Sequence, residues 1–274
     1  MVNLLPGVRA NIAAQQISAA RQEAGDLLTS GRLFANPVSL YTEWVYRQVA
    51  ALRDTLDDGD IRAIFLTHEF DLARVQTDLG QRSTHDAVDH AIRTTVQHLD
   101  AAYTSVEAAR GLWRDKQVVV LDTNVLLRHS AELVEIKWAG RLNWDPDEPI
   151  TLGVPLVVVS ELDSLKLSNS SHVAADGTKQ PQRMLARNAL RRLSELFPGS
   201  HLRDNDVVDG RLSAVLMMDD LRHIRLPSND AAIVDRALAV LPYVEKVAVA
   251  SYDLSLRFLA EKLGLATLVP TDAD

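Results

Sequence analysis

The chain has 274 residues, of which 47% are hydrophobic, and this is enough to bury the core of one large domain or of two smaller ones. A net charge of −8 argues against a protein that coats nucleic acid through its overall field, and the absence of cysteine excludes disulfides, thiolate zinc sites and a cysteine nucleophile. No apolar stretch approaches the ~20 residues of a membrane span, and the N-terminus lacks the features of a secretion signal, so we expect a cytoplasmic protein without membrane contact.

Residues 1–115 are predicted to form an all-helical N-terminal region. Apolar residues recur at helical spacing in its three long segments, which are 11–28, 39–56 and 83–113. None of these segments carries a catalytic motif. Such helices can supply an interface between two copies of the chain or for a regulatory protein partner.

Residues 116–274 are predicted to form a second domain of repeated β-α units. Short Val-rich runs alternate with amphipathic segments, which is typical of an α/β fold with a mostly parallel sheet between helices. The predicted strands are 117–122, 154–159, 212–217, 246–251 and 266–269. The predicted helices are 124–133, 160–168, 181–197, 229–240 and 253–263. The polar segment 167–182 is predicted to be a flexible loop.

An acidic residue stands at the end of a predicted strand or the start of a predicted helix in four places: Asp122, Glu161, Asp230 and Asp253. Each acid alone could be a helix cap or a first-turn acid that the helix dipole favours. Because the carboxyl ends of parallel strands lie along one edge of the sheet, however, the four should meet there. Four like charges at one edge disfavour folding unless a cation lies among them. Carboxylate oxygens without cysteine suit Mg²⁺ or Mn²⁺.

A fifth acid, Asp163, has a simpler interpretation. Ser160 and Asp163 have nearly the spacing of a capping box, in which Asp163 would reach back to the Ser160 amide. We therefore expect Asp163 to be a cap or a residue that supports the site from behind, and Glu161 to be the ligand.

Four segments, in this order, resemble the PIN-domain ribonucleases: VVVLDTNVLL, VPLVVVSELDSLK, SNDAAIVDRAL and VAVASYDLSLRFLAEKLGL. The resemblance covers residues 116–270 and is to the longer form seen in PhoH-linked and decay-factor PIN domains. It implies a PIN-like fold in which the four strand-end acids are catalytic ligands of Mg²⁺ or Mn²⁺, and in which Thr123 or Asn124 orients Asp122. The last motif departs from the usual Thr-Asn-Asp or Thr-Ser-Asp, because Tyr252 follows Ser251, although Ser251 can still donate a hydroxyl hydrogen bond.

Basic residues are densest around the predicted helix 181–197. Arg183, Arg187 and Arg191 follow one another at intervals of four and share one helix face, and Lys179 extends the run. Such a face is either a solvated surface or a contact surface for the phosphates of RNA. The histidines show no metal-ligand spacing and are interpreted as structural or surface residues.

The predicted function is that of a divalent-metal-dependent endoribonuclease that hydrolyses RNA phosphodiesters. A phosphohydrolase of the haloacid dehalogenase type would need a second acid two residues after the first, where this chain has Asn124. A PIN-like module that binds RNA or protein without cleaving is one alternative, and the toxin of a toxin–antitoxin pair is another.

Overall fold

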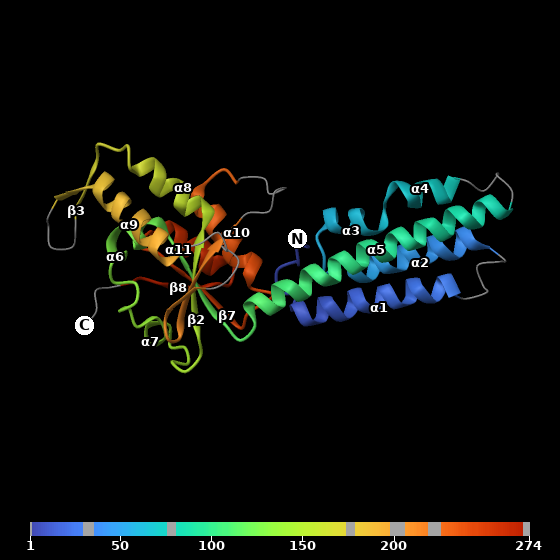
Figure 1. The fold of residues 1–274 in the computed structure, drawn as a ribbon, viewed down its shortest axis with the longest axis horizontal. Coiled ribbons are helices and arrows are strands. Elements are labelled where there is room, and N and C mark those ends of the chain that lie inside the picture. Colours follow the sequence, from blue (N-terminus) through green and yellow to red (C-terminus); the bar gives the residue numbers. More distant parts are fainter. Residues whose placement is uncertain are drawn as a thin grey trace. The chain divides into compact units, whose positions relative to one another are not determined.

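The computed structural model describes residues 2–29, 36–75, 81–173, 179–197, 206–218 and 226–270 (Figure 1). The chain divides into two compact units, Met1–Leu112 and Trp113–Asp274. Among the described residues, no helix has both the length and the apolar composition that crossing a membrane requires.

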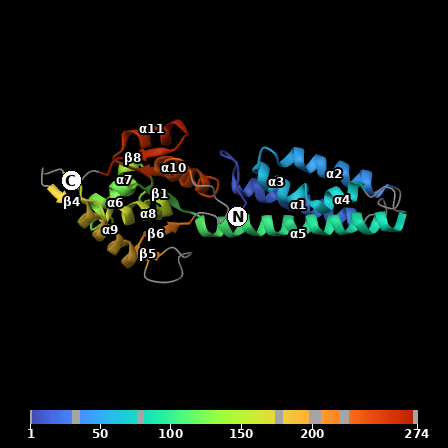
Figure 2. The ribbon, with the colours of Figure 1, turned by 90° about the horizontal axis from the view of Figure 1, so that it is seen from above.

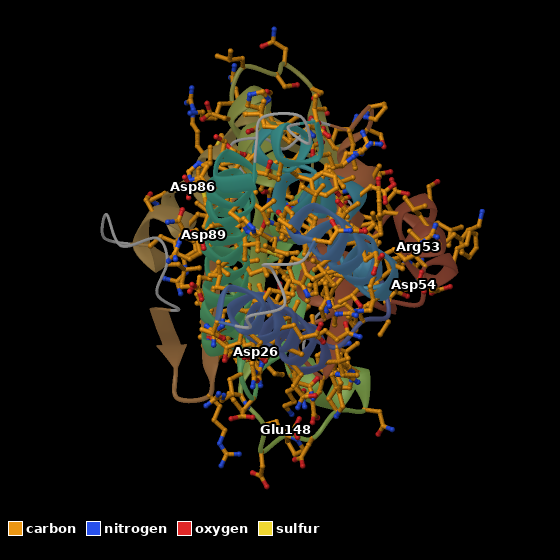
Figure 3. The ribbon with its side chains drawn as sticks, turned by 90° about the vertical axis from the view of Figure 1, so that its right-hand side faces the viewer. Asp26, Arg53, Asp54, Asp86, Asp89 and Glu148 are labelled. Atoms are coloured by element: carbon orange, nitrogen blue, oxygen red, sulfur yellow. The ribbon has the colours of Figure 1, made fainter. Side chains whose placement is uncertain are left out.

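The first unit is built from helices. These are α1 (Ala10–Thr29), α2 (Pro37–Leu52), α3 (Asp58–Phe65), α4 (His68–Val75) and α5 (Gln81–Trp113), whose last residue already belongs to the second unit. Tyr41 links α2 to α5, because its buried hydroxyl lies 2.9 Å from the hydroxyl of Thr95. Charged side chains such as Asp26 and Asp86 are exposed and lie on the outside of these helices (Figure 3). This amphipathic arrangement explains the helical spacing of the apolar residues.

The second unit contains a sheet of six strands in the order β5-β6-β2-β1-β7-β8. The strands are β1 (Gln117–Leu121), β2 (Ile150–Pro155), β5 (Asp206–Asp209), β6 (Leu212–Met217), β7 (Lys246–Ala250) and β8 (Ala266–Leu268). All neighbours run parallel except the edge strand β5, which pairs antiparallel with β6. The central strands are buried along their length, which is why they read as continuous apolar runs.

Helices cover both faces of this sheet and confirm the predicted α/β class. They are α6 (Thr123–His129), α7 (Trp138–Leu142), α8 (Leu156–Leu165), α9 (Gln182–Leu196), α10 (Asn229–Val240) and α11 (Leu254–Lys262). From β1 the chain proceeds to β2 and β6 in one direction, then crosses back to β7 and β8 in the other. Right-handed crossovers therefore place α6, α8 and α9 on one face and α10 and α11 on the other, as Figure 2 shows for α9 and α10.

One predicted strand is wrong. The apolar run predicts a strand at 154–159, whereas β2 ends at Pro155 and Val157–Val159 lie in α8. Proline ends the strand because it has no N–H to donate, and it then serves as the residue before the helix. A short buried apolar run has the same appearance in a strand and in a helix, so periodicity does not separate the two.

The predicted capping box at Ser160 is wrong for the same reason. Ser160 lies inside α8, and its hydroxyl donates to the carbonyl oxygen of Leu156 at 3.0 Å. Asp163 is exposed and forms an ion pair with Lys166 one turn further along. It therefore neither caps α8 nor supports the strand-end acids through a hydrogen bond that the structure shows.

The segment predicted as one flexible loop is partly ordered. Its two ends form a small antiparallel hairpin of β3 (Ser171–Val173) and β4 (Lys179–Pro181), in which Ser171 pairs with Pro181. The short helix α7 and the strand β5 were not predicted, because each is too short to establish a period.

Candidate active site

The strand order places a site between β1 and β7. The chain leaves β1 toward one edge of the sheet and leaves β7 toward the other, so the two connections diverge and open a crevice at the carboxyl ends of these strands. Asp122 follows β1 and Asp253 follows the end of β7 by three residues. The amide of Asp122 donates to the carbonyl oxygen of Ala250 at 3.1 Å, which joins the two strand ends.

Asp122 is the most deeply placed of the four acids. It is 5% exposed and precedes the first residue of α6, yet its side chain makes no capping hydrogen bond. The structure therefore does not support the interpretation of this carboxylate as a simple helix cap. The burial of this carboxylate is costly, because burial disfavours its charged form.

Ser251 connects Asp122 to the loop that carries Asp253. Its fully buried hydroxyl donates to Oδ2 of Asp122 at 2.7 Å and accepts from the amide of Asp253 at 2.9 Å. One side chain thus sets the position of the first acid and the backbone direction of the fourth. The usual Thr at this position of the motif would offer the same hydroxyl.

The two residues after Asp122 hold different acids. The hydroxyl of Thr123 donates to Oε2 of Glu161 on α8 at 2.6 Å, while Nδ2 of Asn124 lies 3.4 Å from Oδ2 of Asp122. The side chain of Thr123 therefore holds the second acid, while its backbone amide donates to the carboxylate of the first. Asn124 contacts Asp122 directly, through a longer hydrogen bond than that of Ser251.

The acids of the last two helices differ in their local roles. In α10 the hydroxyl of Ser228 accepts from the amide of Ala231 at 3.1 Å, so Ser228 is the cap and the carboxylate of Asp230 is not used for this purpose. In α11 Oδ1 of Asp253 accepts from the amide of Ser255 at 2.7 Å. Asp253 is thus a helix cap with one carboxylate oxygen, and its second oxygen takes no part in the cap.

The acids repel one another. Burial raises the pKa of Asp122, and the charge of Glu161 raises it further, while hydrogen bonds from Ser251, the Thr123 backbone and Asn124 oppose both effects. The pKa of Asp230 is raised by burial and then by the charges of Asp253 and Glu161. Within the described parts of the chain, no Lys or Arg forms an ion pair with any of the four. The crevice therefore holds negative charge that the described side chains leave uncompensated.

The residues present suit a divalent cation in their chemistry, although the four acids are not gathered around one point. Among the described residues, no three His, Cys, Asp or Glu side chains lie close enough together to hold one ion. The expectation of a ready-made four-carboxylate cluster is therefore not met by the side-chain positions. The donor set is nevertheless carboxylate oxygen, which Mg²⁺ and Mn²⁺ prefer, and a cation would relieve the repulsion.

A comparison with models of protein families shows to which family the chain belongs. The family model described as PIN domain matches residues 119–269, from β1 to the residue after β8 and including all four acids. The chain belongs to the PIN domain family. PIN domains are generally nucleases, hence hydrolases, and they typically use divalent metal ions. A search of curated proteins found no match.

Tyr252, where this PIN domain departs from the usual motif, packs back onto α6. Its hydroxyl lies 2.5 Å from Nε2 of His129, and the two rings stack with their centroids 5.8 Å apart. The guanidinium of Arg128 lies 4.1 Å from the centre of the tyrosine ring. Sequence reasoning missed these contacts because no spacing rule connects residues 123 positions apart. They show where a bulky side chain is accommodated next to Asp253.

The basic residues lie on the outer face of α9. Ala186, Ala189 and Leu193 are its buried residues, and the helix packs against α6 and α8. The side chains predicted to contact RNA are all exposed: Lys179, Arg183, Arg187 and Arg191. Arg191 lies 4.0 Å from Glu195. The helix α9, which carries the three arginines, thus packs directly on α6, which follows Asp122, and on α8, which carries Glu161, while Lys179 lies on β4 just before α9.

Proposed function

We propose that the PIN domain of this chain is a divalent-metal-dependent endoribonuclease, in which Asp122, Glu161, Asp230 and Asp253 are the ligands of Mg²⁺ or Mn²⁺. The observation that supports this best is Asp122 itself. It is buried at the switch point of the sheet, its pKa is raised, and its side chain makes no helix-capping hydrogen bond. Without a cation, the burial of this carboxylate and its repulsion from Glu161 cost stability that its hydrogen bonds do not fully offset.

The side chains around the acids have positioning roles in this mechanism. Ser251 and Asn124 hold Asp122, and Thr123 holds Glu161, so two ligands from distant segments are oriented before a cation arrives. When bound, the ion supplies a polarised phosphoryl oxygen and a water of lowered pKa for attack on the phosphodiester. The protein needs no covalent nucleophile for this reaction. The four acids supply the negative charge that binds the cation, and the exposed arginines of α9 supply affinity for the phosphates of the RNA strand.

Cleavage of an RNA panel tests the proposal. Purified chain with Mg²⁺ or Mn²⁺ should cut internal phosphodiesters of single-stranded or structured RNAs, and EDTA should abolish cleavage. Matched DNA oligonucleotides define the preference for RNA. Cleavage that persists in EDTA would contradict the metal mechanism. Tight RNA binding without cleavage under any metal would favour the alternative of a PIN module that binds RNA without cutting it.

The combined Arg183→Ala, Arg187→Ala and Arg191→Ala variant should bind RNA more weakly and with a flatter dependence on salt. Each lost phosphate contact lowers the slope of log affinity against log salt by about one, so three contacts give a change of about 2–3. Filter binding or fluorescence anisotropy over a salt series measures this slope. The control replaces Arg53, Arg62 and Arg93, three exposed arginines of the helical unit, with alanine for the same change in charge. If the slope of log affinity against log salt is equal in both variants, the arginines of α9 are an ordinary solvated surface and do not contact RNA.

A further inference from the structure

A pocket of about 360 Å³ lies where the chain leaves α8 and enters α9. Its lining comprises Ser168, Asn169, Ser170 and Ser171 on the side of α8 and β3, and Lys179, Pro181 and Arg183 on the side of β4 and α9. The pocket belongs to the region of the β3–β4 hairpin, which Figure 1 shows beyond the end of α8. Its volume is at the lower end of the range for small-ligand sites, and nearly all of its lining side chains are polar.

Hydrogen bonds order the serine side of this pocket. The amide of Ser170 donates to the hydroxyl of Ser168 at 3.1 Å, and the two hydroxyl oxygens lie 2.5 Å apart. The amide of Gln182 donates to the carbonyl oxygen of Ser170 at 3.0 Å, and Ser171 pairs with Pro181 across the hairpin. The wall is therefore held to the start of α9 by backbone contacts. The hydroxyl of Ser170 donates to Oε1 of Gln182, so the Ser168–Ser170 contact uses the proton of Ser168. The hydroxyl of Ser171 and the side-chain amide of Asn169 form no hydrogen bond in the described parts of the chain and can donate to an acceptor that enters the pocket.

The opposite side carries two positive charges that the described acids leave unmatched. Lys179 and Arg183 are exposed and form no ion pair with any acid in the described parts of the chain. By contrast, Lys166 on α8 is paired with Asp163, and Arg192 on α9 is paired with Glu195 at 3.2 Å. The first turn of α9 contains no acid, so the positive end of its dipole adds to the same field.

We propose that this pocket is a phosphate-binding subsite for the RNA strand, separate from the carboxylates. This inference rests on the proposed function. Two cations in one pocket with the donors of Asn169 and Ser171 match the oxygens of a phosphate group, and the planar guanidinium of an arginine can donate two hydrogen bonds to it at once. Four residues separate Glu161 from the end of α8, about 6 Å of helix. A strand held by one phosphate in the pocket can therefore continue toward the acids.

Inorganic phosphate is the first probe. Titrated into the full chain, it should shift the amide resonances of Ser168–Ser171 in a saturable way, and the Lys179→Gln, Arg183→Gln double variant should bind it at least tenfold more weakly. Both side chains are exposed, so the variant should unfold at the same temperature as the parent, which a melting curve checks. Absence of saturable shifts, or unchanged affinity in the double variant, would overturn the inference.

The matched control lies on the same helix. An Arg187→Gln, Arg191→Gln double variant removes the same charge from α9 but leaves the pocket lining intact. It should weaken RNA binding through the exposed face while binding inorganic phosphate like the parent. If both double variants lose phosphate equally, the anion responds to the general charge of α9 and the pocket is not a site.

Oligoribonucleotides identify the source of the phosphate. If a terminal phosphate occupies the pocket, RNA with a 5′- or 3′-phosphate should bind more tightly than RNA with hydroxyl ends, and the Lys179, Arg183 variant should lose this preference. If an internal phosphodiester occupies it, end chemistry should have no effect, and the variant should weaken all RNAs alike. RNA affinity equal to that of the parent for every end would count against the subsite.

Failure of this inference and failure of the proposed function are distinguishable. Phosphate binding at Ser168–Ser171 requires no metal and should persist in Asp122→Asn and in EDTA. A chain that binds phosphate there but never cleaves RNA would refute the nuclease proposal alone. A chain that cleaves RNA in a metal-dependent way, with no phosphate effect at Lys179 and Arg183, would refute the subsite alone.

Discussion

Asp122→Asn should lower the rate of RNA cleavage by about 100-fold or more while making the protein more stable at neutral pH. The loss follows because asparagine supplies no charge to a cation, and disturbing even the partners of a ligand typically costs about 10–100-fold. The gain in stability follows because burial and the charge of Glu161 both disfavour the ionised carboxylate of Asp122. The amide of asparagine keeps an oxygen that can accept from Ser251. Cleavage rates and urea denaturation in EDTA measure the two effects.

The stability gain should depend on pH in a defined direction. The pKa of Asp122 is raised in the folded state, so ionisation of this group opposes folding. The destabilisation from the ionised Asp122 is complete at pH values above the folded-state pKa. It disappears as the pH falls through that pKa toward the ordinary pKa of about 4. The free energy of unfolding of the variant should therefore exceed that of the parent most at neutral pH, and the two values should become equal in acid. Adding Mn²⁺ should stabilise the parent more than the variant.

Asp235→Asn is the matched control for this experiment. Asp235 lies on α10 like Asp230, but its carboxylate contacts the guanidinium of Arg236 rather than the other acids. Its substitution should leave cleavage and the response to metal near those of the parent. An Asp122→Asn variant that cleaves as fast as the parent would refute the carboxylate mechanism. A variant less stable than the parent at neutral pH would show that favourable contacts of the ionised Asp122 outweigh its burial and its repulsion from Glu161.

Ser251→Ala should destabilise the PIN domain by about 1–3 kcal/mol and reduce metal affinity or cleavage by about 10–100-fold. The buried hydroxyl serves Asp122 and the amide of Asp253 together, so its removal leaves the buried carboxylate of Asp122 and the part-buried amide of Asp253 each short of a partner. It also removes the hydrogen bond that opposes the rise in the pKa of Asp122. Equilibrium unfolding and the metal concentration for half-maximal cleavage are the two measurements.

Two further variants separate positioning from packing at Ser251. Ser251→Thr keeps the hydroxyl and should retain most of the activity. Ser255→Ala makes the same chemical change on the exposed side of α11. The backbone amide of residue 255 can still donate to Asp253, so the change should have little effect on stability or on cleavage. A Ser251→Ala variant with parental metal affinity would limit this serine to a structural role.

Local sequence information was sufficient for the fold class and for most element positions. Alternating Val-rich and amphipathic segments predicted the parallel sheet, and β1, β6, β7 and β8 lie within a residue or so of the expected ranges. The exception has a clear cause. In 150–160 the apolar run extends across a strand and a helix, so the boundary at Pro155 was set by backbone hydrogen bonding rather than by hydrophobicity.

The candidate acids could also be named from the sequence, but only some of their partners could. The family resemblance implies that Thr123 or Asn124 orients Asp122, and Asn124 does contact it through a hydrogen bond of 3.4 Å. In the folded protein the shortest hydrogen bond to Asp122 comes from Ser251, 129 residues away, and Thr123 serves Glu161. Likewise, no pattern indicated that Tyr252 would meet His129, or that Ser168–Ser171 would face Lys179 and Arg183 across one pocket.

The sequence by itself determined that a parallel α/β domain with four acids in the segments after its strands follows a helical region, because strand periods and helix periods are local properties of the chain. Only the tertiary structure decided which acid is buried, which one caps a helix and which cations remain unmatched. Burial, like-charge repulsion and hydrogen-bond pairing depend on distances between segments that the order of residues does not state. That is why Asp122 and Asp253, alike in sequence, differ in the fold: the first is buried beside Ser251, and the second caps α11 at the surface.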